Sequence, residues 1–346
     1  MRRWIIASIA LLGIIMPVQA TGLTPPLAPD SAVVMVPEQP ETFSEGLKTV
    51  IIEAMNYLSP ALRSAGTTCF GVIAVILLAS LIQNFPGATQ KVTDMVATVS
   101  VAMLLLSPSG ALIRLGAEAV AEISEYGKLL LPVMTAAMAA QGGTATSAAL
   151  YAGTAFFDAL LSGIISSVIV PMLYVFLCLA IASCATGAEI LGKLLGLVKW
   201  AMTWSLKIVL YVFTGYMGIT GVVSGAADAA AIKATKLTIS GMVPVVGGIL
   251  SDASEAVLVS AGLVKNAVGM YGVLVIIALW IRPFMEIGVQ YLMLKITAGL
   301  CGIIGAKAPV KLISGFSGAM GMLLGMTGTV SVLLMVSVVC FMRGVE

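Results

Sequence analysis

The stretch from Leu160 to Cys184, LLSGIISSVIVPMLYVFLCLAIASC, runs for 25 residues without a charged side chain. A helix needs roughly 20 predominantly apolar residues to cross a bilayer. Other stretches approach or exceed that length: Val72–Phe85, Val92–Ile113, Ile208–Val223, Val273–Leu294 and Ala319–Met342. Of the 346 residues, 60% are hydrophobic and 10% are charged, which leaves too little polar surface for a soluble protein. The sequence therefore predicts an all-α polytopic membrane protein with about six to eight transmembrane helices.

The first 20 residues have the pattern of a secretory signal peptide. Arg2 and Arg3 are basic, Trp4–Met16 is apolar, and Val18-Gln19-Ala20 has small residues at the positions that a signal peptidase reads. We expect cleavage after Ala20, which would place the mature N-terminus outside the cytoplasm. The alternative is an uncleaved first transmembrane helix.

Residues 21–65 are expected to form an extracytoplasmic segment ahead of a membrane domain over residues 66–346. The part up to Pro40 contains five prolines and predicts an extended tether. Thr42 and Glu45 then have the spacing of a capping box, and apolar residues at helical intervals predict an amphipathic helix that ends at Ser59-Pro60.

Two weaker stretches, 129–157 and 242–269, lack a clean apolar run and predict re-entrant or broken helices. For the first of them, two short spanning helices are an alternative. The spacing of prolines also suggests an internal repeat, over about residues 129–225 and 241–342. The four prolines at which helices would break are Pro132, Pro171, Pro244 and Pro283; the first pair and the second pair are each 39 residues apart.

Glycines recur at intervals of three and four residues in two helical segments. This spacing places them on one helix face, where small residues let helices approach closely in lipid. The pattern favours packing within one chain, and an interface between protomers is the alternative. The candidate packing residues are Gly215, Gly218, Gly221, Gly225, Gly315, Gly318, Gly321 and Gly325.

Lysines between the apolar stretches predict the orientation. With an outside N-terminus and no net crossing by residues 129–157, the positive-inside rule places several lysine-bearing loops in the cytoplasm. These are the loops with Lys91, with Lys193, Lys199 and Lys207, and with Lys295, Lys307 and Lys311.

Three ionisable residues lie within or beside apolar stretches. Arg282 and Glu286 are one helical turn apart beside Pro283, and Asp158 precedes the 160–184 stretch. Ionisable groups in membrane helices are usually paired or face a cavity. A structural ion pair is the favoured interpretation of Arg282 and Glu286, with a role in conduction as the alternative.

Composition excludes several classes of function. The chain has no histidine, which removes Ser–His catalysis and most zinc sites. Its five cysteines form no CxxC pair and fall in apolar segments, so they predict packing groups and no metal site. A net charge of +2 gives no reason to expect nucleic-acid binding. We therefore expect a protein that is not an enzyme and that uses no cofactor or metal.

One block of sequence resembles a known family. Lys233-Ala-Thr-Lys236 leads to Gly241-Met-Val-Pro244-Val-Val-Gly247-Gly248, Ser251-Asp252-Ala253 and Leu263-Val264-Lys265-Asn266. This block, with Leu81-Ile82-Gln83-Asn84 and Gly87-Ala88, is similar to the stage III sporulation protein AE family of endospore-forming bacteria. The likeness runs from about Gly66 to Arg343.

The resemblance implies a multispanning subunit of the channel that links the mother cell and the forespore. It implies a location in the outer forespore membrane and a role in late forespore gene expression. The implied partners are the other subunits of the stage III sporulation A complex, including its ATPase and ring-forming proteins, and through them a forespore channel protein. Membrane lipid surrounds the chain, and a homo-oligomer remains open. A self-sufficient secondary transporter and a non-conducting scaffold are the alternative functions.

Overall fold

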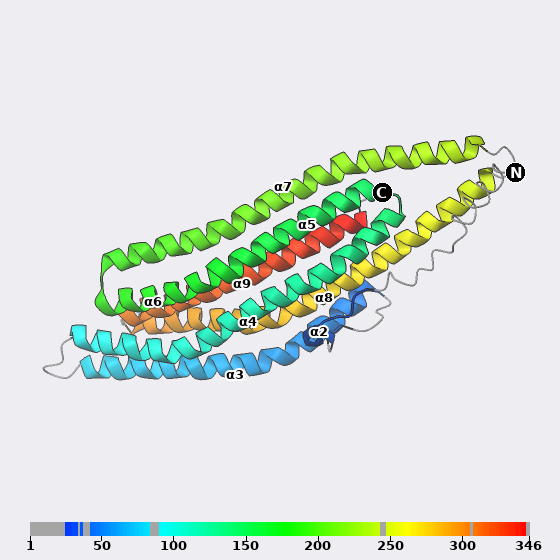
Figure 1. Cartoon of the computed structure of the whole chain (residues 1–346). Coiled ribbons are helices and arrows are strands. Elements are labelled where there is room, and N and C mark those ends of the chain that lie inside the picture. Colours follow the sequence, from blue (N-terminus) through cyan, green and yellow to red (C-terminus); the bar gives the residue numbers. More distant parts are fainter. Residues whose placement is uncertain are drawn as a thin grey trace.

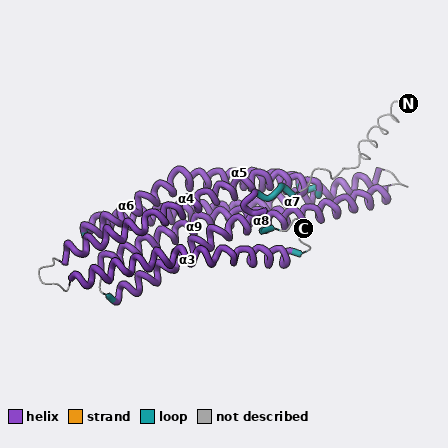
Figure 2. Tube along the Cα trace, turned by 90° about the horizontal axis from the view of Figure 1, so that it is seen from below, coloured by secondary structure: helices purple, strands orange, loops and turns teal. Residues whose placement is uncertain are grey.

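A computed structural model describes residues 25–33, 35–36, 42–83, 90–242, 247–304 and 307–343, with the side chains of 221–260 left outside that description. The predicted signal peptide and Pro244 lie outside the described residues. The described part consists of helices and short connections, and it has no strand (Figure 2). In chain order the helices are α2 (Asp30–Val33), α3 (Phe43–Gln83), α4 (Gln90–Ala140), α5 (Thr144–Ile164), the π-helix η1 (Ile165–Ile169), α6 (Val170–Thr186), α7 (Glu189–Met242), α8 (Gly247–Ile303) and α9 (Lys307–Arg343).

Within the described residues, six helical passes are long and apolar enough to cross a membrane. They are Phe43–Gln83, Gln90–Ala140, Thr144–Thr186, Glu189–Thr220, Ala261–Ile303 and Lys307–Arg343. The prediction of an all-α polytopic membrane protein is therefore confirmed, at the lower end of the expected number of helices.

The helices run side by side in one elongated bundle (Figure 1). The pass from α3 to α4, the turn from α6 to α7 and the pass from α8 to α9 reverse at the same end, which we call the basic end. Lys91, Lys193, Lys307 and Lys311 lie within the first turns of α4, α7 and α9 at this end. Under the positive-inside rule the basic end is predicted to face the cytoplasm.

Residues 129–157 make no net crossing, because they form a helical hairpin away from the basic end. The end of α4 turns at Gln141–Gly143, where Gly142 has φ of 92°, and α5 returns along the bundle. A left-handed Gly187, with φ of 72°, ends α6 in the same way at the basic end. Glycine takes these values without the strain of a Cβ atom.

The helices are continuous where the sequence predicted breaks. Pro132 lies inside α4 and Pro283 inside α8, and likewise α3 passes through Pro60, where its amphipathic part was expected to end. A proline removes one backbone hydrogen bond from a helix, and at these three positions the helix continues past it. Only at Pro171 does the local geometry change: the wider π turns of η1, with Val170 N–H bonded to Ile165 O, come directly before it.

Charged residues on α3 and α4 mark the boundaries of the membrane-embedded layer. Asp94 and Arg114 bracket residues 95–113 of α4, and Arg63 precedes the uncharged residues 64–83 of α3. At 1.5 Å per residue each segment is about 30 Å long, which matches the hydrocarbon thickness of a bilayer. We call the slab that these two segments occupy the membrane layer.

Contacts of α3 and α4 with α8 and α9 show which residues of α8 and α9 lie at the same depth as these boundaries. At the basic end, Asp94 lines a small gap together with Ile304 and Pro309. At the other boundary, a Cβ atom on Gly116 would lie 3.2 Å from Leu323 and 3.6 Å from Ile287. The membrane layer therefore contains about residues 287–304 of α8 and the part of α9 from Pro309 to at least Leu323, so the apolar stretches Val273–Leu294 and Ala319–Met342 lie only partly inside it.

The bundle extends well beyond the membrane layer on the side opposite the basic end. Helix α4 continues for 26 residues after Arg114, which amounts to about 40 Å of helix. Part of the predicted tether packs on this extension: Ala32 and Met35 are fully buried, and Ser31 Oγ donates to Glu122 Oε2 at 2.7 Å. The tether is thus docked over these residues, where an extended chain was expected.

Helix α7 packs more loosely than the helices at the centre. Half of the most apolar window of α8 and of α9 is buried, against 17% for α7. In Figure 1, α7 follows one edge of the bundle, and α9 lies between other helices. Because so little of α7 is buried, each contact that it makes with another helix is expected to matter for holding it in place.

One of those contacts is the seat of Tyr216 on α5. The Tyr216 ring occupies the place where a Cβ atom on Gly153 would be, and its hydroxyl donates to Ala149 O at 2.9 Å. The ring also lies 5.8 Å from Phe157, between ring centroids. Gly153 thus lets α7 approach α5 closely.

We expect Gly153→Ala to lower the thermal stability of the purified protein, because the added methyl group must displace Tyr216. Gly163→Ala on the same helix is the control, since its Cβ atom would meet nothing within 4 Å. Thermal unfolding of both variants in detergent measures the difference. Equal melting temperatures would contradict the proposed seat.

Candidate functional site

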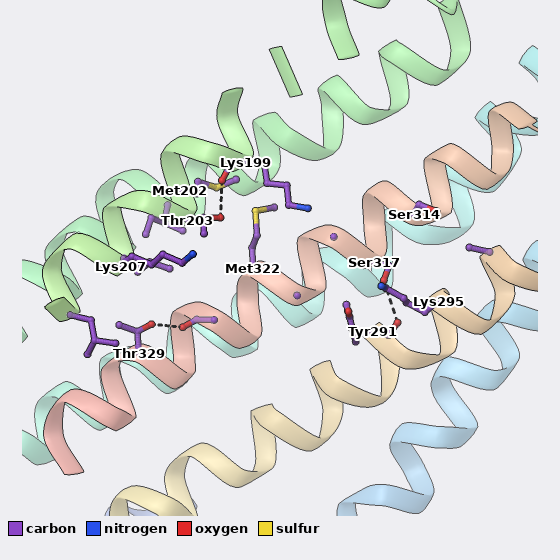
Figure 3. A pocket seen from close by; sticks show the side chains of 17 residues that line it. Lys199, Met202, Thr203, Lys207, Tyr291, Lys295, Ser314, Ser317, Met322 and Thr329 are labelled. Carbon is purple, nitrogen blue, oxygen red and sulfur yellow. Dashed lines mark hydrogen bonds between the residues drawn. The ribbon is translucent and has the colours of Figure 1, made fainter. Parts of the chain in front are cut away.

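A cavity of about 600 Å³ lies between α7, α8 and α9 and is large enough to hold a ligand (Figure 3). Its cationic side chains are Lys199 and Lys207 from α7 and Lys295 from α8. Its small residues come from α9: Ser314, Ser317, Gly318, Gly321 and Gly325. Apolar side chains, among them Ile169, Met202, Leu206, Leu210 and Met322, form much of the remaining wall.

Helical periodicity explains how α7 presents its lysines. Lys199, Thr203 and Lys207 follow one another at intervals of four residues, so they lie along one face of the helix. Figure 3 shows Lys199 and Lys207 directed into the space between α7 and α9. The outward face of α7 instead carries Trp200 and Trp204, which are 61% and 45% exposed.

The cavity begins in the middle of the membrane layer. Lys295 lies about midway between Ile287 and Ile304, the residues that mark the two boundaries on α8. A Cβ atom on Gly192 of α7 would lie 3.7 Å from the Lys311 ammonium, which aligns the start of α7 with that of α9. Lys199, seven residues after Gly192, therefore comes level with Gly318.

The cavity ends at the boundary away from the basic end. Gly325 and Thr329 follow Leu323, which packs on Gly116 near this boundary, and Lys207 comes level with them on α7. The cavity thus connects the centre of the membrane layer with the edge away from the basic end.

Hydroxyl groups in the wall are partly used within the protein. Thr203 Oγ1 donates to Lys199 O, Thr329 Oγ1 to Gly325 O, and Ser317 Oγ to Tyr291 O. The Lys295 ammonium lies 5.4 Å from the centroid of the Tyr291 ring. The free hydrogen-bonding capacity of the cavity therefore consists mainly of ammonium donors.

Some glycines of the predicted stripe pack against neighbouring helices, and others line the cavity or face open space. Gly315 lies against Ala180, and Gly321 lies against Tyr291; a Cβ atom at either position would be 3.3 Å away. Gly318 would come no closer than 4.0 Å to Phe176, and Gly215, Gly218 and Gly325 would meet nothing within 4 Å. The surroundings of Gly221 and Gly225 lie outside the described side chains.

Arg282 and Glu286 form an ion pair outside the cavity. Arg282 Nε donates to Glu286 Oε1 at 3.1 Å, and the guanidinium lies 5.4 Å from the centroid of the Tyr57 ring. Because Ile287 marks the boundary away from the basic end, the pair lies at or just beyond the edge of the membrane layer. The side chains are 46% and 28% exposed, in keeping with that position.

Asp158 lies elsewhere, inside the extension beyond the membrane layer. It is 3% exposed, and Ser124 Oγ donates to its Oδ2 at 2.6 Å. One turn earlier on the same helix, Thr154 Oγ1 donates to Ser337 Oγ at 3.0 Å. These bonds join α5 to α4 and α9, and the structure does not bring Asp158 together with Arg282 and Glu286.

The sequence-based prediction missed Lys199, Lys207 and Lys295 as site residues. It assigned them to cytoplasmic loops, whereas all three lie within continuous helices. The four-residue spacing of Lys199, Thr203 and Lys207 was a signal for a polar helix face. Lys295 had no such signal, because only the packing of α8 on α7 and α9 brings it to the cavity.

We expect the Ser124–Asp158 hydrogen bond to contribute more to the free energy of unfolding than the Arg282–Glu286 ion pair. Arg282→Met or Glu286→Gln removes a partly exposed pair of a kind that contributes about 0.2–0.5 kcal/mol. Ser124→Ala leaves the buried Asp158 carboxyl without its hydrogen-bond donor, at a cost of about 1–3 kcal/mol. Thermal unfolding of the three variants tests this order, and a larger loss for either member of the Arg282 pair would contradict it.

Comparison with known proteins places these observations in a family. Residues 37–344 match the family described as Stage III sporulation protein AE. A curated relative, Stage III sporulation protein AE of Bacillus subtilis (strain 168), is 25% identical over 242 residues, which cover 69% of this chain and 60% of the relative. No solved structure matches the chain. Since the family match extends over most of the sequence, the chain belongs to the Stage III sporulation protein AE family.

Proposed function

We propose that this chain is a membrane subunit of the channel complex that links the mother cell to the forespore, and that the cavity between α7, α8 and α9 is its part of the transport route. The family supports a role in sporulation. The observation that carries the finer proposal is an open cavity with three lysines, which reaches from the centre of the membrane layer to the edge away from the basic end.

Physical cost supports a role for this cavity beyond packing. A charged group at membrane depth is expensive unless it is paired or hydrated, so such residues usually mark substrate or ion pathways. Among the described residues, the lysines of the cavity form no ion pair, and no carboxylate lines the wall. Water or a bound anion in the cavity would offset this cost.

The shape of the chain suits a complex that reaches away from the membrane. The helical extension beyond the membrane layer would project into the intermembrane space of an engulfed forespore, if the chain resides in the outer forespore membrane as we propose. There it could contact ring-forming subunits, and the basic end could meet an ATPase in the mother-cell cytoplasm. The proposed role is non-enzymatic, in line with the absence of histidine from the sequence.

A secondary transporter is the second candidate, because transporter sites commonly lie near the bilayer midplane. Such a protein would act alone, whereas a channel subunit would need its companions. Solute uptake by liposomes that contain only this chain would favour the transporter and count against the channel subunit.

We expect Gly325→Trp to abolish late forespore gene expression and spore formation while the protein still accumulates. A side chain at Gly325 has open space, and in the cavity the indole would obstruct the proposed route. A forespore reporter, the spore yield and an immunoblot of the membrane fraction measure the three outcomes.

Gly163→Trp is the matched control. It adds the same bulk at another open position, on α5 and outside the cavity lining, and should leave sporulation intact. Normal sporulation of Gly325→Trp at wild-type protein levels would refute the proposed route and favour a non-conducting scaffold.

A further inference from the structure

We propose that the cavity between α7, α8 and α9 is an anion-binding site that holds a phosphate group among Lys199, Lys207 and Lys295. This inference rests on the proposed function, because it names the chemical class of ligand for the cavity that we propose as the transport route. Its binding test requires no transport.

The first argument is the charge of the wall. Lys199 and Lys207 come from one helix and Lys295 from another, and all line one cavity of about 600 Å³. No carboxylate is among the lining residues. The other described carboxylates on these three helices do not reach the cavity: Glu189 lies at the basic end of α7, and Glu286 on α8 is paired with Arg282. Three like charges in a partly enclosed site of low dielectric repel one another, and a bound anion removes that cost.

The second argument is hydrogen bonding. Thr203, Ser317 and Thr329 direct their hydroxyl protons to backbone carbonyls. The ammonium groups, with the hydroxyls of Ser314 and Tyr291, are then the donors left for a ligand. An acceptor-rich group with several negative oxygens fits this supply, and phosphate is such a group.

The third argument is the position of the lysines along the membrane normal. Lys199 and Lys295 are near the centre of the membrane layer, where water and ions reach them only through the cavity. Lys207 lies near the edge away from the basic end, on the same helix face as Lys199. The three therefore form a series along which an anion could enter from that edge and reach the centre.

Phosphate chemistry could come from a free phosphorylated solute or from the headgroup of an anionic phospholipid. The apolar wall, which includes Met202, Leu206 and Met322, could accommodate either a hydrophobic part of a solute or an acyl chain. The two sources share the contact with the lysines and are separated by the choice of probe.

The test is protection of lysines in the wild-type full-length protein. The protein is acetylated in detergent with and without inorganic phosphate, at matched ionic strength, and modification of each lysine is followed by mass spectrometry. At a phosphate concentration of about ten times the dissociation constant, the free fraction of the site falls about tenfold, so acetylation of the three cavity lysines should slow by a similar factor. Lys91, Lys193 and Lys307 are internal controls, because they lie at the basic end outside the cavity lining.

A second probe identifies a lipid ligand. The same labelling is carried out in nanodiscs of phosphatidylcholine, with and without phosphatidylglycerol. Protection by inorganic phosphate supports a site for a free phosphorylated solute. Protection by phosphatidylglycerol alone supports a headgroup site. Absence of protection by both probes, or equal protection of cavity and control lysines, overturns the proposal.

A pair of triple variants gives an independent readout. Phosphate should raise the melting temperature of the wild type and of K91Q/K193Q/K307Q, and K199Q/K207Q/K295Q should lose this shift. Equal shifts in both variants would overturn the proposal. Binding can fail in these assays while Gly325→Trp still blocks sporulation, or the reverse, so the anion site and the transport route are tested separately.

Discussion

The thickness of the bilayer is the constraint on which the arrangement of this chain depends. Backbone polar groups in hydrocarbon must be bonded within the protein, so the chain crosses as helices, and charged groups must avoid about 30 Å of each crossing. The uncharged segments 64–83 and 95–113 satisfy this on α3 and α4. Their boundaries then fix the depth of every residue that packs against them.

Helix α7 is an exception to the rule that charged groups avoid the membrane layer, and its lysines line the cavity between α7, α8 and α9. Its uncharged stretch begins only after Lys207, and the alignment of α7 with α9 nevertheless brings Lys199 and Lys207 within or beside the membrane layer. The helix satisfies both demands by its amphipathic face: tryptophans point outward, and lysines point into a cavity kept open by glycines and serines of α9. The loose packing of α7 also leaves room for the cavity, because a tightly packed helix would leave no space for the charged side chains.

Much of the architecture could be predicted from the sequence, since hydrophobic length is a local property. The apolar stretches follow from it, whereas the broken helices predicted for residues 129–157 are the continuous end of α4 and start of α5, joined by a tight turn. Proline was a poorer guide, because Pro132 and Pro283 sit in continuous helices although each removes one backbone hydrogen bond. The depth of Arg282 was also unpredictable, because it depends on where Ile287 meets Gly116 of another helix. The cavity was missed for a similar reason, since its lysines come from helices about 90 residues apart in the chain.

The central claim is that a water-accessible cavity exists at membrane depth on the inner face of α7. The most direct measurement places a nitroxide label at position 203 or 204, in a chain without its five native cysteines, reconstituted in liposomes. Collision rates with oxygen and with a water-soluble nickel reagent are then compared by electron paramagnetic resonance. Thr203 lines the cavity and Trp204 faces outward, so the label at 203 should respond to nickel and the label at 204 to oxygen. A label at 203 that responds to oxygen alone, as a lipid-facing residue does, would contradict the account.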